Sequence, residues 1–96
     1  MSVRNNVSVT ITAQNQFSPA LLIQKGESAS ISVSATSMVA NVRLQRNLDG
    51  TNWRNVEVFT AATEQTYVAD ESCEIRIGCP TGDFTSATAL VARLGL

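Results

Sequence analysis

The chain contains no histidine, the side chain most often used as a general base and as a metal ligand near neutral pH. It also lacks the G-x-S-x-G nucleophile motif, the phosphate-binding loop and the G-x-G-x-x-G dinucleotide fingerprint. Two cysteines and scattered carboxylates do not make a metal site. We therefore expect a protein that is not an enzyme, with no catalytic residues, no bound metal and no cofactor.

Charge is also scarce. Charged residues make up 16% of the chain, against about 25% in typical soluble domains. The seven basic and eight acidic residues are spread along the sequence without a basic cluster, so we expect no binding to nucleic acid. A surface with few charged side chains loses less hydration free energy when a partner covers it, which favours subunit contacts.

Long apolar runs are absent. No segment approaches the roughly 18 apolar residues of a membrane span, and we expect no association with membranes. The first residues, MSVRNNVSVTIT, lack the charged block followed by an apolar block that marks a secretory signal. We therefore expect a protein that is made and used without export, or that leaves the cell by lysis.

The two cysteines, Cys73 and Cys79, are separated by Ile75 and Ile77 at the same strand parity. In an extended strand their Cα atoms would lie roughly 20 Å apart, whereas a disulfide needs about 4.4 to 6.8 Å. The spacing predicts two buried, reduced thiols. A bend at Gly78 and Pro80 would be needed for a disulfide, and this alternative stays open.

The dominant pattern that is present is strict alternation of apolar and polar residues, which is typical of strands with one buried face. No comparable stretch keeps the 3.6-residue period of a helix. Turn signals follow at intervals of about ten residues, and the polar segment Ala61–Gln65 is predicted to be a loop. Residues 1–96 are thus expected to form a single all-β domain, an antiparallel β-sandwich or jelly-roll-like barrel of seven to eight short strands. The alternating runs lie at residues 7–12, 28–35, 73–77 and 90–94.

Residues 42–59, VRLQRNLDGTNWRNVEVF, predict a β-hairpin. A two-residue Asp49-Gly50 turn would place Val56 opposite Arg43, on the wrong face of the pair. A three-residue loop of Leu48, Asp49 and Gly50 instead sets Val42 opposite Val56, with Gly50 in the left-handed conformation of a bulged turn.

In that register Gln45 pairs with Trp53, so Trp53 and Phe59 lie on the face opposite the core, with Arg43 diagonally near the indole. A tryptophan on a solvent face needs an explanation. Either Arg43, a loop or a terminal strand covers the ring within the chain, or Trp53, Arg43 and Phe59 form an interface with another subunit. A second bulge in the hairpin would change both interpretations.

The segments FSPALLI, VRLQRNLDGTNWRNVEVFTA and YVADESCEIRIGCPTGDFTSATALVARL resemble a family of short phage and prophage proteins. The family pattern combines a central V-x-L-Q-R-S-x-D-G-x-x-W-x-D-V-E with a later Y-R-I-G-x-x-T-G-D-Y-T-S-G. The resemblance covers roughly Phe17 to Leu94. This chain departs from it at Asn47, Phe84 and Ala87, where Ser, Tyr and Gly are usual.

The resemblance implies a bacteriophage virion structural protein, foremost a capsid decoration or cement protein that stabilises the head by contacts with the major capsid protein or other virion subunits. It would be assembled in the host cytoplasm and located in the virion. Decoration proteins of this class are often trimeric, so a homo-oligomer is expected. The first alternative is a tail, fibre or head–tail accessory protein. The second is a glycan-binding module in which Trp53 acts with Asn52 and Asn55.

Overall fold

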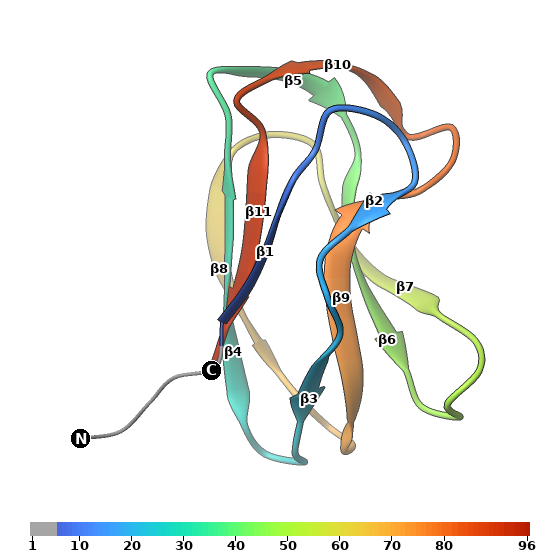
Figure 1. Ribbon diagram of the computed structural model, residues 1–96. Coiled ribbons are helices and arrows are strands. Elements are labelled where there is room, and N and C mark those ends of the chain that lie inside the picture. The colour runs from blue at the N-terminus through green and yellow to red at the C-terminus, as the bar shows by residue number, and fades with distance from the viewer. Residues whose placement is uncertain (1–5) are drawn as a thin grey trace.

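The computed structural model describes residues 6–96, which form eleven β-strands and no helix (Figure 1). The all-β class predicted from the alternating pattern is confirmed. Within the described residues no helix is long and apolar enough to cross a membrane. The strands are β1 (Asn6–Thr10), β2 (Gln16–Phe17), β3 (Leu21–Ile23), β4 (Ser28–Ser34), β5 (Ser37–Ala40), β6 (Val42–Asn47), β7 (Arg54–Phe59), β8 (Thr63–Val68), β9 (Cys73–Cys79), β10 (Phe84–Thr88) and β11 (Val91–Gly95).

Two antiparallel sheets stand face to face as a sandwich, and a short pair crosses one end of it (Figure 1). The first sheet, here called sheet A, has the strand order β1-β11-β4-β8. The second, sheet B, has the order β2-β9-β6-β7, and β3 also pairs with β9. The pair β5 and β10 forms the crossing segment at the top of Figure 1. The structure is therefore a small β-sandwich, as the sequence predicts, although residues 6–96 form eleven strands instead of the seven to eight expected.

The core consists of the inward-facing residues of both sheets. In β4, Ala29, Ile31 and Val33 are buried while the serines between them face outward. The same alternation in β9 buries both cysteines and both isoleucines. The buried apolar residues are Ile11, Leu21, Ile23, Ala29, Ile31, Val33, Ala40, Val42, Leu44, Phe59, Ala69, Cys73, Ile75, Ile77, Cys79, Leu90, Ala92 and Leu94.

The sandwich is closed on one side and open on the other. On the closed side β1 of sheet A contacts β2 of sheet B. On the open side β7 and β8 are the last strands of their sheets, so each has one unpaired backbone edge within residues 6–96. The loop prediction for Ala61–Gln65 is wrong at this point, because Thr63–Val68 forms β8. The segment is polar, but Thr63, Thr66, Tyr67 and Val68 are residue types that favour strands, and its backbone pairs with β4.

The register predicted for the central hairpin is also wrong. Near the loop Arg46 pairs with Arg54, so Leu48 to Trp53 form a six-residue connection rather than a three-residue one. Farther along, Val56 is an extra residue in β7, a β-bulge between Asn55 and Glu57. From Glu57 onward, the bulge shifts the pairing of β7 with β6 by one residue, so the residues of β7 exchange faces. Val42 therefore pairs with Phe59 and not with Val56.

Candidate interaction surface

The outward face of sheet B carries large side chains that pack on one another. The outward positions are Glu74, Arg76 and Gly78 in β9 and Arg43, Gln45 and Asn47 in β6, and Gly78, Gln45 and Asn47 are buried there by their neighbours. Pairing of β6 with β9 sets Gln45 beside Arg76. Antiparallel pairing thus brings residues about 30 positions apart into one row on this face.

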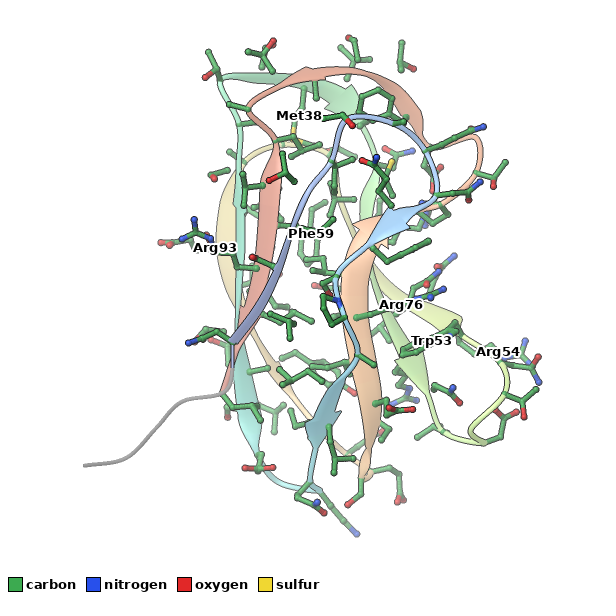
Figure 2. The ribbon with its side chains drawn as sticks, viewed as in Figure 1. Met38, Trp53, Arg54, Phe59, Arg76 and Arg93 are labelled. Atoms are coloured by element: carbon green, nitrogen blue, oxygen red, sulfur yellow. The ribbon has the colours of Figure 1, made fainter. Side chains whose placement is uncertain are left out.

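Arg76 lies between two aromatic rings. The Cζ atom of its guanidinium is 3.9 Å from the centroid of the Phe17 ring and 4.3 Å from the centroid of the Trp53 ring. Figure 2 shows Trp53 reaching back from the loop towards Arg76 on β9. Cation–π attraction of this kind strengthens when the cation is partly desolvated. Burial does lower the pKa of the Arg76 guanidinium below its ordinary value, although it stays charged near neutral pH.

Two amide side chains restrain the guanidinium between the rings, Gln45 by a direct hydrogen bond and Asn55 by a hydrogen bond to Gln45. The Nε of Arg76 donates to Oε1 of Gln45 at 2.9 Å, and Nε2 of Gln45 donates to Oδ1 of Asn55 at 2.9 Å. Gln45 is buried although it faces outward, because Arg76 and its neighbours cover it. The chain of hydrogen bonds crosses from β9 through β6 to β7 and restricts the rotation of Arg76.

Phe17 reaches this stack because Gly78 has no side chain. Phe17 pairs with Gly78 in the register of β2 and β9. A methyl group on Gly78 would overlap the carbonyl oxygen of Gln16 and lie 2.5 Å from Cδ1 of Phe17. The glycine therefore allows β2 and the phenyl ring to lie directly on β9.

Of the residues predicted for an interface, Trp53 lies on the outer side of sheet B, half-buried, as expected. Arg43 does not cover it, because its Nε forms an ion pair with Oδ2 of Asp83 at 2.6 Å, and this pair lowers the pKa of Asp83. The prediction that Phe59 lies on the surface is wrong. It is 3% exposed and belongs to the core, since the bulge at Val56 turns it inward.

Neither Arg76 nor Phe17 is among the residues that the sequence predicts for this surface. In the sequence, Arg76 is a cation at an outward position between two buried isoleucines. Strands usually leave such a cation in solvent, so nothing in the sequence marks Arg76 as part of a stack. Among residues 6–96, Oδ1 of Asn47 is the buried side-chain atom that has no hydrogen-bond partner. It belongs to the same face, two positions after Gln45.

Asp49 and Gly50 shape the loop that carries Trp53. Asp49 accepts hydrogen bonds from the backbone N–H groups of Thr51 and Asn52, both at 2.8 Å, and these bonds lower its pKa to about 2. Gly50 has φ of 80°, so the left-handed conformation predicted for it is confirmed. The turn role of both residues holds, in a longer loop than predicted.

The open side of the sandwich is the second surface of interest. Here a cleft of about 500 Å³ lies between the two sheets, bordered by Leu48, Val56, Tyr67 and Val68. Leu48 and Val68 are 53% and 59% exposed, an unusual state for large apolar side chains that lie together. Arg46 crosses the cleft, donating to Oδ1 of Asp70 at 2.6 Å and to the Tyr67 hydroxyl at 3.3 Å, and both bonds raise its pKa.

The chemistry of the remaining polar groups is simple. Residues 6–96 contain no group of three or more Cys, Asp or Glu side chains that could hold a metal ion. Cys73 and Cys79 are both free and buried, so the predicted thiols are confirmed. Burial raises the pKa of both. A buried thiol with a raised pKa is a poor nucleophile.

No protein-family model, curated protein sequence or solved structure matches this chain.

Proposed function

We propose that this chain is a structural protein of a bacteriophage virion that acts through protein–protein contacts, as a decoration or cement protein on the capsid. The sequence resemblance supports the class of protein, and the open side of the sandwich supplies the surface by which it would attach. It requires no catalytic step and no cofactor. The partner would be the major capsid protein or another virion subunit, and the protein would act as a homo-oligomer in the virion.

The observation that carries the proposal is the combination of two unpaired strand edges with exposed apolar residues. Both β7 and β8 end their sheets at the cleft, and β8 carries one charged residue, Glu64, and no proline. Such an edge is a template for pairing with a strand of another chain. Leu48 and Val68 supply apolar area beside that edge. The edge and the apolar residues together suit a permanent contact in an assembly.

The glycan-binding alternative receives less support from the arrangement of its three residues. Trp53 stacks on Arg76, Asn55 accepts a hydrogen bond from Gln45, and Asn52 donates to Asp49. The ring of Trp53, Oδ1 of Asn55 and Nδ2 of Asn52 are therefore engaged within the chain. A sugar would have to displace these contacts before it could bind.

Electron microscopy of particles made with and without the protein tests the proposal directly. We expect additional density at symmetric positions of the shell when the protein is present, and unchanged shell density would contradict the proposal. Copy number separates the alternatives, because hundreds of copies per particle indicate the shell and a handful indicate the tail.

A matched pair of variants tests the surface. Leu48→Arg puts a charge at the cleft, whereas Val39→Arg makes the same kind of change on β5, where Val39 is 60% exposed. We expect Leu48→Arg to reduce occupancy of the particle at least about tenfold, as for a residue central to an interface. Val39→Arg should bind like the unmodified protein. Equal binding by both variants would show that the cleft is not the contact.

A further inference from the structure

The guanidinium of Arg76 has hydrogen-bonding capacity that the described part of the chain does not use. An arginine has five N–H donors. Within residues 6–96 one of them, at Nε, donates to Gln45, and the four on the two Nη atoms have no hydrogen-bond partner. The Nη atoms form the end-on fork that binds a carboxylate through two parallel hydrogen bonds.

Arg76 also has no counter-ion among residues 6–96. The ion pairs of the described residues are Arg43 with Asp83 and Arg46 with Asp70, and neither includes Arg76. Glu74 lies on the same face two positions earlier, but it is exposed and forms no ion pair with Arg76. No carboxylate of the described residues thus compensates the charge of Arg76, while each ring beside it displaces water from one face of the guanidinium.

The side chain is oriented in advance of any binding. Phe17 and Trp53 fix the plane of the guanidinium, and Gln45 fixes its rotation about that plane. A flexible surface arginine loses rotamer entropy when it forms an ion pair, and a fixed one has already lost it. This combination of a held arginine and a tryptophan is typical of the residues that dominate the free energy of protein interfaces.

We propose that Arg76, between Phe17 and Trp53, is a receptor for the carboxylate of an Asp or Glu side chain on a partner protein. The inference rests on the proposed function and names the chemistry of the partner. A carboxylate suits the site better than a phosphate, because the neighbouring Glu74 carboxylate repels an anion of one negative charge less than an anion of two, and a single arginine balances only one charge. The chain also has no basic cluster of the kind that phosphate backbones require.

The test uses the isolated protein with ¹⁵N-labelled arginine and sodium propionate, a monocarboxylate that matches the glutamate side chain, as the probe, with sodium chloride at equal ionic strength as reference. We expect a saturable shift of the Arg76 Nε–H resonance with half-saturation on the order of 10–100 mM, typical of one charge-assisted pair in water. Arg93, on sheet A, is an internal control that should respond alike to both salts. A response at Arg76 no larger than that at Arg93 would overturn the proposal.

Variants at Arg76 and Trp53 separate the effect of the bidentate guanidinium geometry from the effect of positive charge alone. Arg76→Lys keeps the positive charge and loses the bidentate geometry, and we expect it to bind the probe at least about fivefold more weakly. Trp53→Leu keeps the arginine and removes one ring, and an intermediate loss is expected. Arg93→Gln should bind like the unmodified protein. The dispersion of each variant's amide spectrum shows whether it is folded, and binding by Arg76→Lys at full affinity would contradict the proposal.

Further outcomes identify other occupants. Tighter binding of inorganic phosphate than of propionate at equal ionic strength would overturn the assignment to a carboxylate. A shift of Arg76 that depends on protein concentration without any probe would assign the site to a second copy of this chain and would likewise overturn it. Because the titration needs no particles, its failure leaves the capsid proposal standing, and a negative result from microscopy leaves the titration valid.

Discussion

The outward faces of the two sheets follow the same alternation yet differ in what they carry. Sheet A presents hydroxyl side chains from β1 and β4 around Arg93, and beyond β4 the outward residues of β8 are Glu64, Thr66 and Val68. Sheet B presents Arg76 inside a stack of aromatic and amide groups. Figure 2 shows Arg93 projecting away from the sandwich and Arg76 lying beside Trp53. Each arginine occupies an outward position between buried residues of its strand.

The difference arises from the neighbours that the register supplies. Arg93 pairs with Ser8 and with Ser32, whose side chains are too short to cover it. Arg76 pairs with Gln45, and the glycine two positions later admits Phe17. The same residue type on the same kind of position is thus solvated in one sheet and fixed in the other. Surface function in a β-sandwich depends on cross-strand partners more than on the residue itself.

The largest effect is expected from Gly78→Ala, which should separate Phe17 from Arg76 and so remove a main difference between the two sheet faces. Its Cβ would overlap the Gln16 carbonyl and lie 2.6 Å from Cα of Phe17, so β2 must move away from β9. We expect a loss of about 3 kcal/mol in the free energy of unfolding, measured by urea titration. Ser30→Ala on sheet A is the control and should change it by less than about 0.5 kcal/mol. Equal stability of the two variants would refute the close approach.

A direct comparison of Arg76→Ala with Arg93→Ala should give the next largest effect. Removing Arg76 deletes two cation–π contacts and leaves Oε1 of Gln45 without its donor, so we expect a loss of about 2 kcal/mol. Arg93 has no hydrogen bond or ion pair within the described residues, and its removal should cost less than about 0.5 kcal/mol. Trp53 fluorescence during urea unfolding measures both. Similar losses for the two arginines would erase the distinction between the faces.

A smaller effect, limited to acid, is expected from Asp49→Asn in the loop that presents Trp53. The pKa of Asp49 is lowered from 3.8 to about 2 in the folded protein by the N–H groups of Asn52 and Thr51. Its stabilising contribution is therefore present above about pH 4 and is lost as the pH falls towards 2. Urea midpoints measured between pH 5 and pH 2 should fall less steeply in Asp49→Asn. The control, Asn52→Ala, retains both backbone donors and should keep the steeper decline. If the urea midpoints of Asp49→Asn fell with pH as steeply as those of the unmodified protein, the proposed role of Asp49 would be contradicted.

The smallest effect, none at all, is expected from a reducing agent. Cys73 and Cys79 lie on the inward face of β9, beneath Arg76, and both are free. The strand is therefore held by burial on one face and by the stack on the other, without a covalent link. Dithiothreitol should leave the urea midpoint unchanged. A lower midpoint under reduction would reveal a disulfide and overturn the assignment of free thiols.

Much of the fold was predictable because strand alternation is a local property. The buried positions of β4 and β9 follow from period two alone, and so does the all-β class. The left-handed conformation of Gly50 also follows from its place in a polar turn. The short or polar strands were less accessible. Thr63–Val68 is a strand because β4 offers it a complete hydrogen-bonding edge, which its own sequence does not reveal.

The candidate surface was only partly predictable. Parity arithmetic placed Trp53 outside the core, which the structure bears out, but it could not detect the bulge at Val56 that buries Phe59. It also assigned Arg43 to the indole, whereas Asp83 from a distant turn binds Arg43. The cation that contacts Trp53 is Arg76, on β9. The pairing of β9 with β6 joins residues about 30 positions apart, and local sequence patterns do not reveal it.

The sequence by itself determined that this chain is a small all-β protein, with thiols and isoleucines alternating inward in β9 and a glycine at the tip of the Trp53 loop. These features depend on backbone geometry and on side-chain alternation over a few residues. The tertiary structure alone decided that Phe17, Trp53 and Gln45 meet at Arg76 and leave its guanidinium without a counter-ion among residues 6–96. Those contacts join three strands and a loop, and they depend on the pairing of β6 with β9 and on the glycine that lets β2 lie on β9.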